Sequence, residues 1–166
     1  MESSVKLLGH PAHQMLVVFP AGLLVTSLVF DVLYRISDLP ELAVVAYYLI
    51  AAGIIGGLLA APFGLIDWLK IPRDTRARAV GAAHGIGNVT VVLLFIVSFV
   101  MRMDAPHAPG VIAHIFSAVG TLLLLVTAWL GGELIDRLGV GICDDTGLNA
   151  PSTLRRPHTE TKIAGR

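Results

Sequence analysis

The chain has 166 residues, of which 55% are hydrophobic and only 14% are charged, and its formal net charge is zero. A water-soluble domain of this length needs a more highly charged surface, so the composition excludes an ordinary soluble domain and indicates a membrane protein. The single cysteine, Cys143, excludes an intramolecular disulfide and a cysteine-rich metal site.

Two histidines precede the first apolar segment. In "LGHPAHQMLVVFP", His10 and His13 lie three residues apart, directly before a segment that we predict to be helical from 13 to 35. Pro11 suits the first position of this helix, with His10 as its N-cap. Pro20 is expected to kink the helix, because proline cannot donate the backbone hydrogen bond one turn back.

Three further apolar segments predict helices at 42–69, 80–103 and 111–136. About 20 apolar residues in a helix cross the hydrocarbon core of a bilayer, so all four segments qualify as spans. The connections between them are short. We therefore predict an all-α fold, an integral membrane bundle of four antiparallel transmembrane helices within residues 1–137.

The remaining segment, residues 138–166, loses the apolar periodicity and gains glycine, proline, threonine and charge. This composition predicts a solvated, disordered tail.

The basic residues predict the orientation of the bundle. We call the end that holds the N-terminus, the loop between the second and third spans and the tail side A, and the opposite end side B. Side A holds ten of the twelve Lys and Arg residues, namely Lys6, Lys70, Arg73, Arg76, Arg78, Arg137, Arg155, Arg156, Lys162 and Arg166. By the positive-inside rule, side A is expected to be cytoplasmic, with both termini there.

Each span brings polar or ionisable groups to side A. They are His10 and His13 on the first, Asp67 on the second, His84 and Asn88 on the third, and Glu133 and Asp136 on the fourth. Ionisable groups within a membrane are costly, so they usually face the bundle interior and pair with one another. We therefore expect these groups to converge on one cluster near the cytoplasmic surface.

Such a cluster suits three functions. His84 with His10 or His13 could bind a metal or supply the two axial ligands of a haem b, with Asp67, Asn88, Glu133 and Asp136 holding the imidazoles or relaying protons. The same carboxylates and imidazoles could serve proton or small-solute transport. The third alternative is a structural or regulatory membrane protein whose polar groups only tie the helix ends together. The metal, the redox partner and the oligomeric state stay open.

Side B offers less. Asp31 and Arg35, four residues apart, are expected to pair within one helix. His107 and His114 have no histidine partner on another span and are expected to be interfacial. No nucleophile–base arrangement, phosphate loop or nucleic-acid motif occurs, so no reaction class and no nucleic-acid partner are predicted. The basic loop between spans two and three is expected to meet anionic lipid in the bilayer.

Three segments resemble one family. "GHPAHQMLVVFPAGL", "APFGLIDWLKIPRDTRARAVGAAHGIGN" and "WLGGELIDRLGVG" look like signature segments of the bacterial membrane family called domain of unknown function 2231, over roughly residues 8–142. The resemblance implies four spans in a bacterial inner membrane. Some members are joined to a Rieske-type iron–sulfur domain, which implies electron transfer. This chain has one cysteine and no Rieske motif, so such a partner would be a separate protein.

Overall fold

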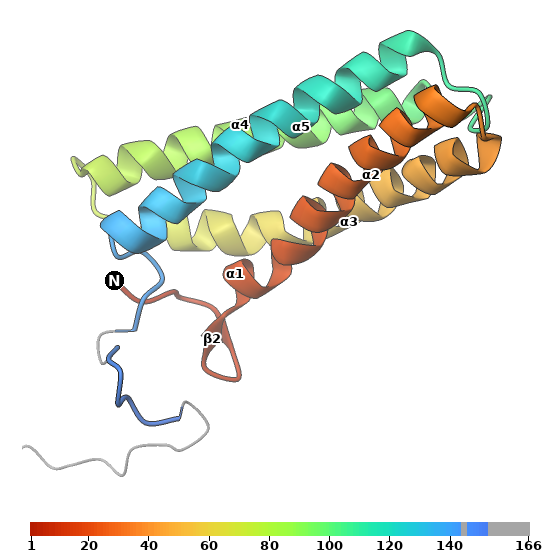
Figure 1. Cartoon of the computed structure of the whole chain (residues 1–166). Helices are drawn as coiled ribbons and strands as arrows, with labels where there is room; N and C mark the ends of the chain where they lie inside the picture. Colours follow the sequence, from red (N-terminus) through yellow and green to blue (C-terminus); the bar gives the residue numbers. More distant parts are fainter. Residues whose placement is uncertain (144–145, 153–166) are drawn as a thin grey trace, which may run out of the picture.

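The computed structural model describes residues 1–143 and 146–152 and is almost entirely helical (Figure 1). Its elements in chain order are β1 (Lys6–Leu7), β2 (His10–Pro11), α1 (Ala12–Leu16), α2 (Val18–Ser37), α3 (Pro40–Lys70), α4 (Arg76–Val100), α5 (Val111–Gly132) and a π-helical turn, η1 (Glu133–Arg137).

Four helical segments of this part of the chain are long and apolar enough to cross a membrane. They are Ala12–Ser37, Pro40–Lys70, Arg76–Val100 and Val111–Arg137. The predicted all-α bundle of four antiparallel spans is therefore confirmed. At side B the α2–α3 and α4–α5 connections lie together, and at side A the N-terminal segment, the α3–α4 loop and the end of α5 lie together (Figure 1).

The first span is interrupted where the sequence predicts. Pro20 has no N–H to donate to the Leu16 carbonyl, and the helix is broken at Val17 between α1 and α2. Pro20 is buried and packs against Gly56 of α3. The interruption separates α1, with His13 on it, from the longer α2.

Close helix contacts build the apolar core. Helix α2 packs along α3 and α4 along α5, and the two pairs meet through α3–α4 and α2–α5 contacts. The buried residues at the centre are Leu24, Ile50, Ile54, Val91, Phe95 and Leu124. A Cβ on Gly53 would lie 2.5 Å from Cδ2 of Leu24, so the missing side chain is what allows α2 and α3 to approach.

Side A is covered by the N-terminal segment. A turn at Leu8 and Gly9, both with positive φ, joins β1 to β2, and Leu7 pairs with His10. His10 thus lies in a strand and not at the helix N-cap as expected, because Pro11 completes the hairpin before α1 begins. The backbone of Met1 bonds to Gly139 and Gly141, which fixes the first part of the predicted tail against this segment. Residues 144–145 and 153–166 of that tail lie outside the described residues, so its disorder stays a prediction.

A buried ion pair joins three helices at side B. The Arg102 guanidinium donates to both carboxylate oxygens of Asp31, at 2.6 and 2.7 Å, and also to the hydroxyls of Ser98 and Ser117, at 3.2 and 3.0 Å. The side chains of Arg102 and Asp31 are 0% and 1% exposed. The expected pair of Asp31 with Arg35 is therefore wrong, because both oxygens of Asp31 are occupied by a guanidinium from the end of α4.

We predict that Arg102→Leu lowers the free energy of unfolding by about 3 to 5 kcal/mol, because it leaves the Asp31 carboxylate buried without a partner. The double variant Asp31→Leu/Arg102→Leu should lose less, since it removes both charges. Reversible unfolding in detergent micelles measures the difference. The control is Arg73→Leu, at an exposed loop residue, where a change within about 0.5 kcal/mol is expected. A single variant as stable as the parent would contradict the prediction.

Candidate functional site

Two imidazoles from different spans meet at side A. His13 of α1 and His84 of α4 are half-buried, their ring centroids lie 6.4 Å apart, and the rings are nearly perpendicular, at 86°. Helix α4 positions His84, and α1 positions His13 against α3. The prediction that His84 lies near a histidine of the first span is thus met by His13.

The His13 ring is oriented by α3. Its Nδ1 lies 3.1 Å from the carbonyl oxygen of Ala60. A carbonyl only accepts, so Nδ1 carries a hydrogen, and in the neutral form of the ring Nε2 carries the lone pair. The ring rests on Gly64, where an added Cβ would lie 2.7 Å from Cε1 of His13.

The His84 ring is oriented in the same way by α5. Its Nδ1 lies 2.8 Å from the carbonyl oxygen of Thr127, and its Cε1 faces Gly131. The Asn88 amide nitrogen donates to the His84 carbonyl at 2.9 Å and lies 3.1 Å from Nε2 of His84. The Thr127 hydroxyl lies 3.0 Å from the Asn88 amide oxygen and fixes that amide. Nε2 of His84 is therefore also a lone-pair nitrogen, and Asn88 is its present partner.

The two imidazoles have the hydrogen-bonding pattern that is usual for metal-bound histidines. Imidazoles that bind a metal through Nε2 usually donate Nδ1–H to a carbonyl or carboxylate, and both rings already do so. No group of three His, Cys, Asp or Glu residues that could hold a metal ion occurs within 1–143 and 146–152. The site thus brings together two imidazoles, fewer than the three groups that such a metal site needs.

The other predicted members of the cluster have different partners. The Asp67 carboxylate accepts from the hydroxyl of Ser3 and the backbone N–H of Ser4, each at 2.7 Å. It therefore anchors the N-terminal segment, and the expectation that it accepts from His84 is wrong, since the Thr127 carbonyl takes that place.

The remaining three predicted residues also lie apart from the imidazoles' hydrogen bonds. Glu133, in η1, pairs with Arg76 at 2.6 Å. His10 and Asp136 are exposed. The expected single cluster is thus reduced to His13, His84 and Asn88.

Sequence reasoning missed the groups that orient the two rings. The Ala60 and Thr127 carbonyls are backbone atoms, which carry no signal in the sequence. Gly64 and Gly131 did carry one, because both stand among small residues on apolar spans, a pattern that indicates close packing without naming its partner.

Residues 9–144 match the family described as "Predicted membrane protein (DUF2231)". Neither the curated proteins nor the solved structures give a match.

We predict that Gly64→Ala displaces the His13 ring and lowers the free energy of unfolding by about 1 to 3 kcal/mol, because the new methyl group overlaps the imidazole. Gly132→Ala is the matched control, since a Cβ there meets nothing within 4 Å. Unfolding in detergent and the ¹⁵N chemical shifts of His13 report the two effects. Equal behaviour of the two variants would show that His13 does not rest on Gly64.

Proposed function

The chain belongs to the DUF2231 family of predicted membrane proteins, and we propose that it is a haem-binding electron-transfer subunit of the membrane. The observation that carries this proposal is the pair His13 and His84, each with Nδ1 on a backbone carbonyl, so that Nε2 is the nitrogen that would bind a ligand, on His84 in place of Asn88. The two residues stand on different spans, which is how a transmembrane bundle supplies axial ligands from facing helices.

The number of ligands favours haem over a bare ion. A zinc site takes three or four protein ligands, whereas a haem brings four nitrogens of its own and needs two axial groups. Imidazole nitrogens bind first-row metals at about 2 Å, so nitrogens on opposite sides of one ion are about 4 Å apart. The two ring centroids lie 6.4 Å apart, so both imidazoles are near enough to approach one group.

The chain's own residues have defined parts in this proposal. The Ala60 and Thr127 carbonyls hold the imidazoles in the tautomer that puts the lone pair on Nε2. Asn88 is the group that an incoming ligand displaces from Nε2 of His84. A bound haem would supply one-electron chemistry.

We further propose that the protein lies in a bacterial inner membrane with both termini in the cytoplasm, where a separate redox protein exchanges electrons with it. The concentration of Lys and Arg at side A supports this orientation. Side A is also where His13 and His84 lie, so the pair would be reached from the cytoplasmic surface.

A structural role without a cofactor is the second candidate. One observation favours it: both ring nitrogens of His84 already have partners, so the Thr127–Asn88–His84 contacts tie α4 to α5 unaided. Proton transport through Asp67, His84 and Glu133 has less support. Asp67 is held by the N-terminal segment and Glu133 by Arg76, and none of the hydrogen bonds between described residues connects either carboxylate to His84.

Haem titration of the purified protein tests the proposal. Haemin should give a Soret band typical of two axial imidazoles. His13→Ala and His84→Ala should each lower the affinity at least about tenfold, because losing a ligand costs no less than losing a group that orients one.

His10→Ala and His107→Ala are the controls, because both side chains are exposed and both should bind haemin like the parent. Absence of a Soret band in the parent, or an unchanged affinity in His84→Ala, would favour the structural role.

We also predict that a reporter fused after Arg166 behaves as cytoplasmic and that one inserted between Asp38 and Glu41 behaves as periplasmic. The physical reason is the retention of Lys and Arg on the cytoplasmic side during insertion. Alkaline phosphatase and green fluorescent protein fusions measure the two locations. The opposite pattern would place His13 and His84 at the periplasmic surface.

A further inference from the structure

The hairpin before α1 exposes two leucines at its tip. Strands β1 and β2 are joined by a turn at Leu8 and Gly9, and Leu7 is the last residue of β1. Leu7 and Leu8 are 58% and 72% exposed, and no charged residue stands between Lys6 and His10. Two large apolar side chains at one tip form a surface suited to contact with a membrane or another protein.

Leu8 also holds a conformation that leucine disfavours. Its φ is 52°, in the left-handed region where glycine is the usual residue. Because most of its surface is exposed, its side chain packs little against the described part of the chain, and packing does not offset the strain. A strained residue that displays a large apolar side chain suits a contact outside the chain.

One arm of the hairpin is fixed at the depth of the membrane surface by Asp67. The backbone N–H of Ser4 donates to the Asp67 carboxylate at 2.7 Å, next to Trp68 at the side-A end of α3. Trp68 lies about 30 Å along α3 from the exposed Tyr48, at 1.5 Å rise per residue. That length equals the thickness of the hydrocarbon core, and tryptophan and tyrosine favour its two boundaries. Ser4 is therefore held at the side-A boundary.

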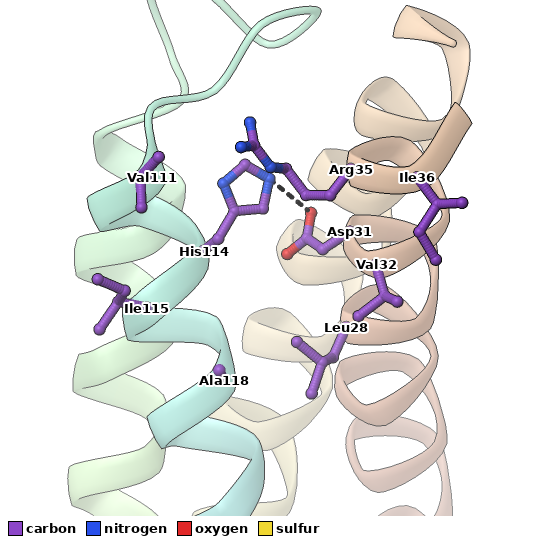
Figure 2. Close-up of a pocket in the computed structure, with 9 residues that line it drawn as sticks. All are labelled: Leu28, Asp31, Val32, Arg35, Ile36, Val111, His114, Ile115 and Ala118. Carbon is purple, nitrogen blue, oxygen red and sulfur yellow. Dashed lines mark ion pairs between the residues drawn. The ribbon is translucent and has the colours of Figure 1, made fainter. Parts of the chain in front are cut away.

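The other arm reaches the same depth through the first span. Arg35, in the last turn of α2, extends past Asp31 toward side B (Figure 2). Val18, the first residue of α2, lies about 26 Å from Arg35 along the helix, so α2 alone crosses most of the hydrocarbon core and α1 lies near its side-A boundary. The N–H of Ala12, the first residue of α1, donates to the Val5 carbonyl at 2.9 Å and ties the two arms together.

The hairpin is short and lies beside the bundle. In Figure 1 it projects to the side, away from the other three spans. Each strand has two residues, so the tip lies about 7 Å from the start of α1. The head-group layer on each side of the hydrocarbon core is about 5–7 Å thick. Exposed Met15, Val18 and Phe19 follow at the start of the same span, so the tip is within reach of the lipid around it.

We propose that the hairpin tip is a membrane anchor: Leu7 and Leu8 insert between the lipid head groups on side A and contact the upper part of the acyl chains. The contact is apolar, since the neighbouring Lys6 is paired with Glu2, and it therefore does not depend on the charge of the head groups. Because the hairpin leads directly into α1, the anchor holds the end of the first span that carries His13, with or without a bound cofactor.

A fluorescent label next to the tip tests the anchor and leaves both leucines in place. Cys143 is the only cysteine of the chain, so His10→Cys in a Cys143→Ser background carries one nitrobenzoxadiazole label, at the residue that pairs with Leu7. The full chain is reconstituted in phosphatidylcholine vesicles in which some lipid bears a nitroxide near the top of its acyl chain. Quenching should be severalfold stronger for this label than for one at Asp74→Cys, an exposed side-A residue that is also in the left-handed region.

Two variants of the labelled chain show whether the leucines are responsible. Leu7→Ser/Leu8→Asn should lose most of the quenching, because it removes both apolar side chains while asparagine tolerates the left-handed region. Leu148→Ser is the matched control, since it removes a fully exposed leucine from the segment after α5, and it should be quenched like the parent. Circular dichroism confirms that each variant is folded.

Replacing part of the phosphatidylcholine by phosphatidylglycerol should leave the quenching unchanged, which separates an apolar anchor from a site for anionic lipid. Three results would overturn the proposal. They are equally weak quenching at the two labelled positions, as expected if the leucines contact a partner protein, unchanged quenching in Leu7→Ser/Leu8→Asn, and quenching that requires phosphatidylglycerol.

Discussion

The interior of a bilayer contains no water that could pair with a charge, and Arg102 must therefore find its partners within the bundle. From the turn after α4 it finds them on three helices: both oxygens of Asp31 on α2, and the hydroxyls of Ser98 on α4 and Ser117 on α5. Removing any one partner leaves a charge or a donor unsatisfied, which costs far more here than at a wet surface. The relative positions of α2, α4 and α5 at side B follow from this single guanidinium.

Polar groups at side A must also find their hydrogen-bond partners within the bundle, and there the partners are backbone carbonyls. There the imidazoles of His13 and His84 satisfy their N–H groups with backbone carbonyls, Ala60 on α3 and Thr127 on α5. Each ring thus connects two helices and still keeps a lone pair. His84 lies about 21 Å along α4 from Ser98, so the two polar layers stand near opposite ends of the bundle. One layer is a closed network around a charge, and the other retains lone pairs that suit a ligand.

The sequence was sufficient for the four spans, for the interruption caused by Pro20 and for the meeting of His84 with a histidine of the first span. Each of these follows from local composition or from which end of a helix a residue occupies. It was not sufficient for the partner of Asp31. Arg35, four residues away, is a good local candidate, and only the packed bundle brings in Arg102 from a different helix.

Asp67 shows a similar limit. Its place on the small-residue face of α3 indicated a buried partner, but that partner is the N-terminal segment, which carries no helical pattern. His10 lies in one of the two-residue strands of a hairpin, which are too short to leave a pattern in the sequence. Helix faces are readable from periodicity, whereas contacts made by irregular segments depend on the assembled structure.

The proposed cofactor site depends on His13 and His84 offering their Nε2 lone pairs to one group, with Asn88 giving up its contact with Nε2 of His84. ¹⁵N NMR of the histidine-labelled protein, recorded before and after adding one equivalent of haemin, tests it most directly. The account predicts that both rings begin with protonated Nδ1 and unprotonated Nε2, and that haemin broadens or shifts the signals of these two histidines while those of His10 and His107 are unchanged. A hydrogen on Nε2 of either ring in the free protein, or unaltered signals from both rings after addition, would contradict it.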